Sequence, residues 1–158
     1  MDWRSGSAEE TRALGKGLAA VLRPGDVLAL IGDLGAGKTT FVQGVASGLG
    51  ASERAITSPS FVLVRECGRG RIPLFHADLF RLDNPAGAAT VGLEEYYDAG
   101  GVTVIEWADR IPGILPDQFL EIRFEALDPE TRRMTVIPRG ENYRRRFEAG
   151  SGFGSELP

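Results

Sequence analysis

The chain of 158 residues contains only one cysteine, Cys67, and one histidine, His76. One cysteine excludes an internal disulfide and a multi-cysteine zinc site, which is typical of proteins in a reducing compartment. No apolar run approaches the roughly 18–20 residues that span a bilayer, so no transmembrane segment is expected. The first residues also lack the basic start and apolar stretch of a secretory signal. We therefore expect a cytoplasmic protein without a membrane partner.

Lysine is scarce as well. Among the 18 basic residues only Lys16 and Lys38 are lysines, and 22 acidic residues give a formal net charge of −4. This acidic balance argues against a chain that binds nucleic acid by bulk electrostatics alone. The length is that of one domain. We predict this domain over residues 1–149 and a disordered Gly/Ser-rich tail over residues 150–158.

Strands and helices alternate along the chain. Ser7 and Glu10 form a capping box that predicts a helix start, with Pro24 as its stop. The apolar run Val27–Ile31 predicts a buried strand, and a second helix is expected from Lys38 to Leu49. Further strands are predicted at residues 61–64, 72–76, 102–105, 119–124 and 134–137, and a short helix at residues 93–97. The pattern predicts a three-layer α/β domain with a mixed central sheet and a late β-hairpin.

Two smaller predictions concern turns and edges. Pro73 lacks the N–H that a central strand needs, so its strand is expected at an edge of the sheet. The turn of the late hairpin is expected near Asp128 and Pro129.

The most informative segment follows the first strand. Residues 32–39 read GDLGAGKT and match the phosphate-binding P-loop, G-x-x-x-x-G-K-[ST]. Glycines let backbone amides face phosphate oxygens, and the following helix adds its positive N-terminal dipole. Lys38 is expected to bind the β- and γ-phosphates, and the Thr39 hydroxyl to ligate Mg²⁺. Together these features predict a P-loop NTPase.

A P-loop nucleotidase also needs acidic groups near the metal. Glu106 closes a second apolar strand, which is where a residue holding Mg²⁺ or its waters is expected. Asp78 follows another strand and is a candidate for orienting water. The hydroxyls of Thr57–Ser60 are candidates for sensing the γ-phosphate. His76 is interpreted as a core or surface histidine rather than a catalyst, and Trp107 either packs on the sheet or presents a surface. The three arginines at 144–146 are interpreted as a solvated run.

Taken together, these segments resemble one family. GDLGAGKTT, TSPSFVLV, HADLFRL and VIEW, in this order and spacing, are similar to the TsaE (YjeE) family of bacterial ATPases. This resemblance implies a Mg²⁺-dependent ATPase that works with the proteins TsaB and TsaD. Together they form the threonylcarbamoyl group on the adenosine next to the anticodon of tRNAs reading ANN codons. The tRNA would be a partner only through the complex.

The resemblance also implies roles for individual residues. It implies that Lys38, Asp78 and Glu106 serve hydrolysis, and that Thr39 and Glu106 hold the metal. It also implies that an arginine late in the chain, Arg132 or Arg133, reaches the nucleotide. The residues implied to contact ATP are Ala8, Thr11, Leu34, Gly35, Ala36, Gly37, Lys38, Thr39 and Arg132.

Two other readings of the P-loop remain. A small-molecule kinase of this size would usually carry an arginine-rich lid, and no contiguous segment of that kind occurs. A guanine-nucleotide switch would need an N-K-x-D motif, and neither lysine has that surrounding sequence. The partner-dependent ATPase is therefore the preferred interpretation, with the kinase second.

Overall fold

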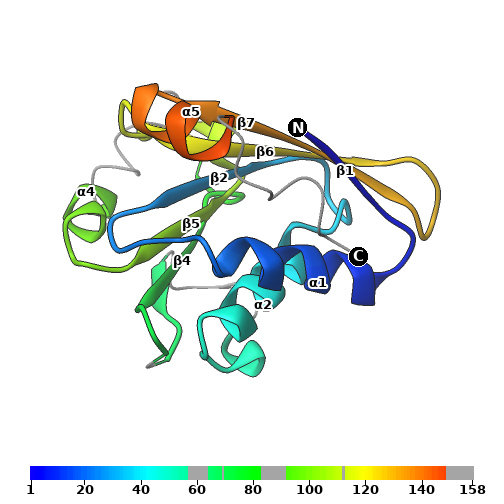
Figure 1. Cartoon of the computed structure of the whole chain (residues 1–158), viewed down its shortest axis with the longest axis horizontal. Helices are drawn as coiled ribbons and strands as arrows, with labels where there is room; N and C mark the ends of the chain where they lie inside the picture. Colours follow the sequence, from blue (N-terminus) through cyan, green and yellow to red (C-terminus); the bar gives the residue numbers. More distant parts are fainter. Residues whose placement is uncertain (57–63, 69, 83–91, 112, 149–158) are drawn as a thin grey trace.

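Seven strands form one sheet in the computed structural model, which describes residues 1–56, 64–68, 70–82, 92–111 and 113–148 (Figure 1). Their order across the sheet is β1-β7-β6-β2-β5-β4-β3. The strands are β1 (Asp2–Ser5), β2 (Val27–Ile31), β3 (Val64–Glu66), β4 (Leu74–Asp78), β5 (Val102–Glu106), β6 (Phe119–Ala126) and β7 (Arg132–Arg139).

The sheet is parallel in its centre and antiparallel at its flanks. β2 runs parallel to both β5 and β6, and β4 runs parallel to β5. β1 and β6 pair antiparallel with β7, and β3 pairs antiparallel with β4. The predicted mixed sheet and late hairpin are thus both confirmed, and the hairpin turn lies between Ala126 and Arg132 as expected.

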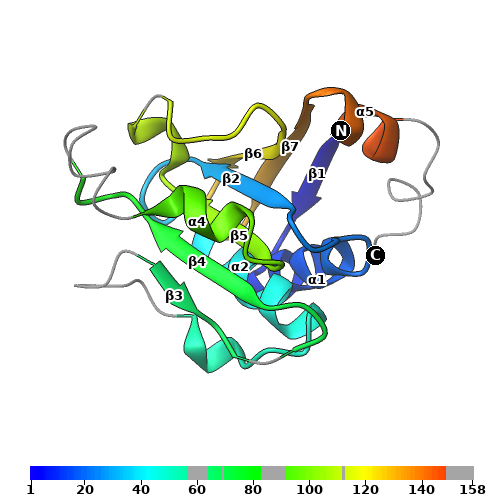
Figure 2. The same cartoon turned by 90° about the vertical axis from the view of Figure 1, so that its left-hand side faces the viewer.

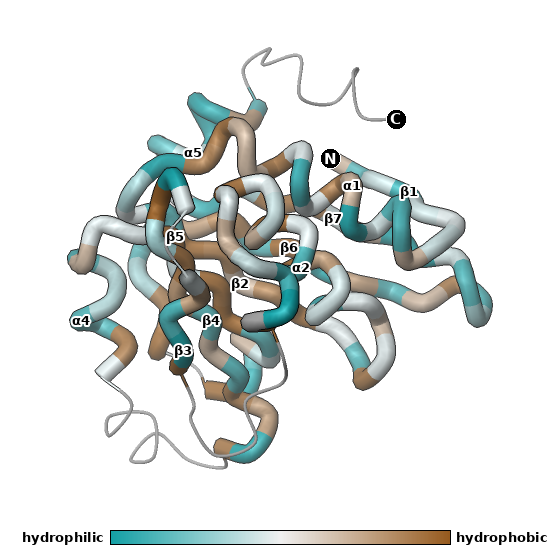
Figure 3. The backbone as a smooth tube through the Cα atoms, turned by 90° about the horizontal axis from the view of Figure 1, so that it is seen from below, coloured by the Kyte–Doolittle hydropathy of each residue, from teal (hydrophilic) through white to brown (hydrophobic). Residues whose placement is uncertain are grey.

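Helices cover both faces of this sheet. α1 (Ala8–Ala19) and α2 (Lys38–Gly48) lie on one face, whereas α4 (Leu93–Tyr97) lies on the other (Figure 2). α5 (Glu141–Phe147) follows the last strand, and two single 3₁₀ turns occupy Glu53–Ala55 and Ala108–Arg110. Hydrophobic residues gather in the central strands (Figure 3), and two buried clusters fill the two sides. The predicted three layers are confirmed.

The two helices of the first layer approach each other unusually closely. A Cβ atom added at Gly44 of α2 would lie 2.1 Å from the backbone oxygen of Arg12 in α1. Only glycine allows this distance, because any side chain would overlap the opposing backbone. The start of α1 is capped as predicted, since the Glu10 N–H donates to Ser7 Oγ at 3.1 Å. Close packing therefore holds the beginning of α1 in a defined position beside α2.

The structure differs from the sequence prediction in several places. β1 and α5 were not predicted, because β1 contains a single apolar residue, Trp3, and α5 is only seven residues long. The prediction that Pro73 lies in an edge strand is wrong. β4 begins one residue later, at Leu74, and lies between β3 and β5. The first helix ends at Ala19, before the predicted stop.

Some predictions fall outside the described residues. These are the strand residues 61–63, the Thr57–Ser60 segment and the tail at residues 150–158. Among the described residues, none of the helices has both the length and the apolar character that crossing a bilayer requires.

The prediction of a solvated arginine run is wrong for Arg146. Its guanidinium donates to both carboxylate oxygens of the buried Asp26, at 2.6 and 2.8 Å. The hydroxyl oxygen of Tyr143 accepts a hydrogen bond from the Val27 N–H at 2.9 Å, and burial raises the pKa of this tyrosine. α5 is thereby anchored to the amino-terminal end of β2.

This anchor predicts unequal effects of two neighbouring arginines. Arg146→Ala should lower the free energy of unfolding by about 3 kcal/mol, because it leaves the Asp26 carboxylate buried without its cation. Arg145→Ala is the matched control. Its partner is Glu141, both side chains are more than 70% exposed, and the expected change is within about 0.5 kcal/mol. Urea denaturation of the two variants tests this, and equal losses would contradict it.

Candidate functional site

The loop between β2 and α2 has the backbone shape of a phosphate-binding loop. Gly37 has φ +100°, a conformation that glycine adopts without strain, and it is also the N-cap of α2. No side chain caps this helix start. The first N–H groups of α2 are therefore available to an anion, and the helix dipole favours negative charge there.

Lys38 lies inside this loop. Its ammonium donates to the carbonyl oxygens of Gly32 and Asp33 at 2.5 and 2.8 Å, and the residue is only 4% exposed. It also lies 4.2 Å from the centroid of the Trp107 ring, within the range of a cation–π interaction. Burial lowers the pKa of Lys38, and the nearby carboxylates, Glu106 above all, oppose that shift.

A chain of hydrogen bonds links the P-loop helix to two strands of the sheet. Thr39 Oγ1 donates to Glu106 Oε1 at 2.8 Å, and Glu106 Oε2 lies 2.6 Å from His76 Nε2. Both Glu106 and His76 are buried. The sequence predicted the pairing of Thr39 with Glu106 at one metal site, but it did not predict His76 behind them.

Asp78 lies beside the same group because β4 and β5 run in parallel. Their register places Asp78 opposite Glu106. Burial raises the pKa of Asp78, while the hydrogen bond from the Phe80 N–H at 2.9 Å opposes this shift. The carboxyl ends of β2, β4 and β5 thus bring Lys38, Asp78 and Glu106 to one edge, where open α/β sheets bind ligands.

Trp107 is a feature of the site that sequence reasoning missed. It is the one non-glycine residue with positive φ, +57°, in the described part of the chain. For a bulky side chain this conformation is strained, and such strain is often found at functional sites. The strained turn places the indole over Lys38 and 4.9 Å from the ring centroid of Phe80. The only signal in the sequence was its position directly after Glu106.

The oxygen donors of this group fit magnesium. A hydroxyl from Thr39 and a carboxylate from Glu106 are hard ligands, which Mg²⁺ prefers, and Mg²⁺ usually adds substrate phosphates and water to one or two carboxylates. No cluster of three or more His, Cys, Asp or Glu residues able to hold a metal occurs within the described ranges. The donor set therefore suits a cation bound together with a phosphate group better than one bound by protein alone.

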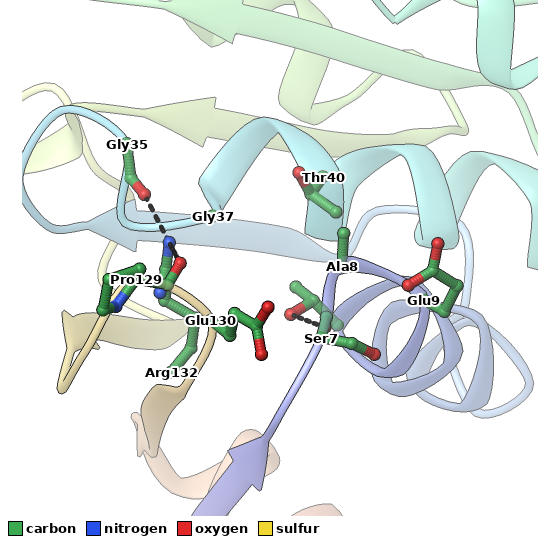
Figure 4. A pocket seen from close by; sticks show the side chains of 10 residues that line it. Ser7, Ala8, Glu9, Gly35, Gly37, Thr40, Pro129, Glu130 and Arg132 are labelled. Atoms are coloured by element: carbon green, nitrogen blue, oxygen red, sulfur yellow. Dashed lines mark hydrogen bonds between the residues drawn. The ribbon is translucent and has the colours of Figure 1, made fainter.

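A cleft of about 360 Å³ adjoins the P-loop on the side of α1. Figure 4 shows its three walls, which are the P-loop with α2, the start of α1, and the turn between β6 and β7. Ala8, Thr11, Gly35, Gly37 and Arg132, which the resemblance implied, all line it. The lining residues that the sequence did not indicate are Ser7, Glu9, Thr40, Pro129 and Glu130.

The structure distinguishes between the two candidate arginines. Arg132 lines the cleft, and its guanidinium donates to the carbonyl oxygen of Gly35 at 3.2 Å and to that of Asp128 at 2.8 Å. Arg133 instead pairs with Glu125 at 3.5 Å on the exposed surface, away from the lining. Arg132 therefore joins the hairpin turn to the P-loop.

Four implied residues are not part of this lining. Lys38 and Thr39 belong to the group around Glu106 described above, and the other two do not present their side chains to the cleft. Leu34, at the tip of the P-loop, is 80% exposed, and Ala36 is buried in the core. Only their backbone groups are candidates for phosphate contacts. The Thr57–Ser60 segment lies outside the described residues, so its relation to the cleft stays a prediction.

Comparisons with known proteins agree with one another. The family model "Threonylcarbamoyl adenosine biosynthesis protein TsaE" matches residues 5–134. A protein of Bacillus subtilis (strain 168) with the name tRNA threonylcarbamoyladenosine biosynthesis protein TsaE is 41% identical over 143 residues, covering 90% of this chain and 89% of the relative. A protein of the same name from Treponema pallidum (strain Nichols) is 39% identical over 132 residues, covering 84% and 96%.

A solved structure is similar as well. The crystal structure of YdiB from Bacillus subtilis superposes with a TM-score of 0.78 at 40% sequence identity. The match covers 94% of this chain and 91% of the YdiB chain.

The geometry around Glu106 predicts a metal-dependent effect. In Glu106→Gln, the part of the nucleotide affinity that depends on Mg²⁺ should fall by about 10–100-fold or more, because a neutral amide replaces an anionic ligand. Affinity measured in EDTA should stay nearly unchanged, since a carboxylate that holds the metal would act only through it. Calorimetric titration with and without Mg²⁺ checks this. Equal losses in both conditions would indicate a purely structural role.

Proposed function

The chain belongs to the TsaE family, whose members are involved in the biosynthesis of threonylcarbamoyladenosine in tRNA, and on this premise we propose that it is a Mg²⁺-dependent ATPase of that process. The observation that carries the proposal is the juxtaposition of Lys38, the Thr39–Glu106 pair and Asp78 beside the cleft. These groups match what phosphoryl transfer requires, which is charge stabilisation, metal ligands and a residue that positions the nucleophile.

The P-loop and Lys38 would bind the phosphates. The free N–H groups at the start of α2 offer hydrogen bonds to phosphate oxygens. Lys38 already points into the loop, and a phosphate oxygen would replace the carbonyls of Gly32 and Asp33 as its acceptors. Burial and the Trp107 ring exclude water from this ammonium, which strengthens its attraction to the charge that develops in the transition state.

Thr39 and Glu106 would hold Mg²⁺, which when bound neutralises charge on the β- and γ-phosphate oxygens. Asp78 would orient the attacking water. One of its carboxylate oxygens accepts the Phe80 N–H, which limits the rotation of the side chain, and the other accepts no hydrogen bond from the described residues. The 360 Å³ cleft between α1 and the hairpin turn would take the nucleoside, with Arg132 as part of its wall.

The further proposal concerns partners. We infer that the chain works with TsaB and TsaD, which together form the threonylcarbamoyl group on the adenosine next to the anticodon in tRNAs reading ANN codons, and that it meets tRNA only through them. The negative net charge supports indirect rather than direct tRNA contact. Leu34 and Phe80, exposed at 80% and 42% around the phosphate site, support a protein partner covering that edge.

The ATPase proposal predicts the effect of removing the P-loop cation. Lys38→Ala should reduce the rate of ATP hydrolysis at saturating ATP by about 10²–10³-fold, because it removes a preorganised charge from the phosphate site. Arg145→Ala serves as a control, since that side chain lies on the exposed face of α5. Wild-type turnover in Lys38→Ala would refute the assignment. Transfer of phosphate to a small molecule, rather than release as inorganic phosphate, would favour the kinase.

The partner proposal predicts a slow enzyme that association accelerates. Arg132 is engaged by backbone carbonyls, so the arginine that often completes such sites would come from a partner. A trans-acting arginine accelerates related nucleotidases by about 10³–10⁵-fold. Steady-state hydrolysis by the pure chain, repeated with TsaB and TsaD present, is the measurement. A rate that is fast alone and indifferent to the pair would contradict the proposal.

A further inference from the structure

His76 is a buried polar residue to which neither the resemblance nor the comparisons assign a role. We propose that His76 is a positioning residue that orients the Glu106 carboxylate toward the metal, and that it thereby sets the affinity of the site for Mg²⁺. The inference rests on the proposed function, since it concerns how the nucleotide site holds its cation.

The contact itself is direct and fully buried. His76 is 0% exposed, and its Nε2 lies 2.6 Å from Glu106 Oε2. A carboxylate oxygen can only accept, so the imidazole donates from Nε2. Nδ1 is buried and has no hydrogen-bond partner among the residues that the structure describes. All of the hydrogen bonding that this side chain shows is therefore directed at Glu106.

Packing alone does not explain why a histidine occupies position 76 of the sheet. In the parallel register of β4 and β5, His76 lies opposite Val104, and the preceding pair on the same face is Leu74 with Val102. All three of these neighbours are fully buried and apolar. A leucine at position 76 would continue this row without burying a polar nitrogen, which costs free energy. The histidine is explained by what it does for Glu106.

The two carboxylate oxygens of Glu106 have separate partners, so one oxygen can bind a metal while the other stays hydrogen-bonded. Oε1 accepts from Thr39 at the start of α2, whereas Oε2 is bonded to the buried His76 of β4. Thr39 and Oε1 would hold Mg²⁺, and the bond from His76 to Oε2 would still fix the plane of the carboxylate. Outer-shell partners of this kind orient metal ligands, and their loss typically costs about 10–100-fold in metal affinity.

The experiment compares three variants by Mg²⁺ titration of nucleotide binding. His76→Leu should weaken the apparent Mg²⁺ affinity about 10–100-fold while nucleotide affinity in EDTA stays unchanged. His76→Gln, whose amide N–H extends about as far as Nε2–H, should recover most of this loss. Thr103→Val is the matched control. Like His76, Thr103 is fully buried and polar, but its hydroxyl has no hydrogen-bond partner among the described residues, and in the β4–β5 register it pairs with Phe75 rather than His76.

A measurement on the unaltered protein covers the case in which His76→Leu fails to fold. Because the chain has one histidine, ¹⁵N labelling of histidine gives the nitrogen signals of a single imidazole. We expect the proton on Nε2, with an Nε2 signal that shifts in Glu106→Gln and on addition of Mg²⁺ with nucleotide, but little with nucleotide in EDTA. A proton on Nδ1 with no response of Nε2 to Glu106→Gln would overturn the proposal.

The results separate this inference from the proposed function. Wild-type Mg²⁺ affinity in a folded His76→Leu, with ATP hydrolysis intact in the unaltered chain, overturns the role of His76 alone. Equal losses in His76→Leu and Thr103→Val also overturn it, because they would reflect core disruption. Absence of any nucleotide binding by the unaltered chain would instead refute the ATPase proposal.

Discussion

The parallel pairing of β5 between β2 and β4 is the constraint on which the site depends. One register places Leu30 and Asp78 on either side of Glu106, so the acidic groups meet at the carboxyl end of β2, where the P-loop begins. A shift of one residue would turn the Glu106 side chain to the opposite face of the sheet. Such a shift would also move each apolar side chain of the strand from one buried cluster to the other, where it would not fit the existing packing. Hydrophobic packing of the strands therefore determines where the acidic side chains of the site lie.

Three segments distant in the chain are then held against this edge by different forces. The start of α1 is positioned by backbone contact with α2 at Gly44. The β6–β7 turn is joined to the P-loop by Arg132, through the carbonyl oxygen of Gly35. β4 contributes His76 and Asp78 through strand pairing. The cleft is thus formed by elements that the fold stabilises independently of any ligand, which reduces the entropy cost of binding one.

Several polar side chains of the site are buried in the protein interior, where apolar side chains are usual. Lys38, His76 and Glu106 are each at least 96% buried, and the backbone of Trp107 is strained beside them. Each such feature lowers the stability of the fold. The Lys38–Trp107 contact and the hydrogen bonds of Glu106 offset part of this loss. Elsewhere in the described residues two comparable groups occur. Asp26 with Arg146 anchors α5 at the other end of β2, and Glu121 pairs with Arg123 and Arg139 within the β6–β7 hairpin.

The local features follow from short stretches of the sequence. The P-loop, the cap at Ser7, the second helix and the buried strands each depend on residues adjacent in the chain, whose backbone preferences and periodicity are readable directly. The fold alone sets which distant side chains meet. It paired His76 with Glu106, 30 residues apart, and Arg146 with Asp26, 120 residues apart. It also placed Arg132, and not Arg133, in the lining of the cleft, because successive residues of a strand point to opposite faces and only strand pairing decides which face meets the cleft.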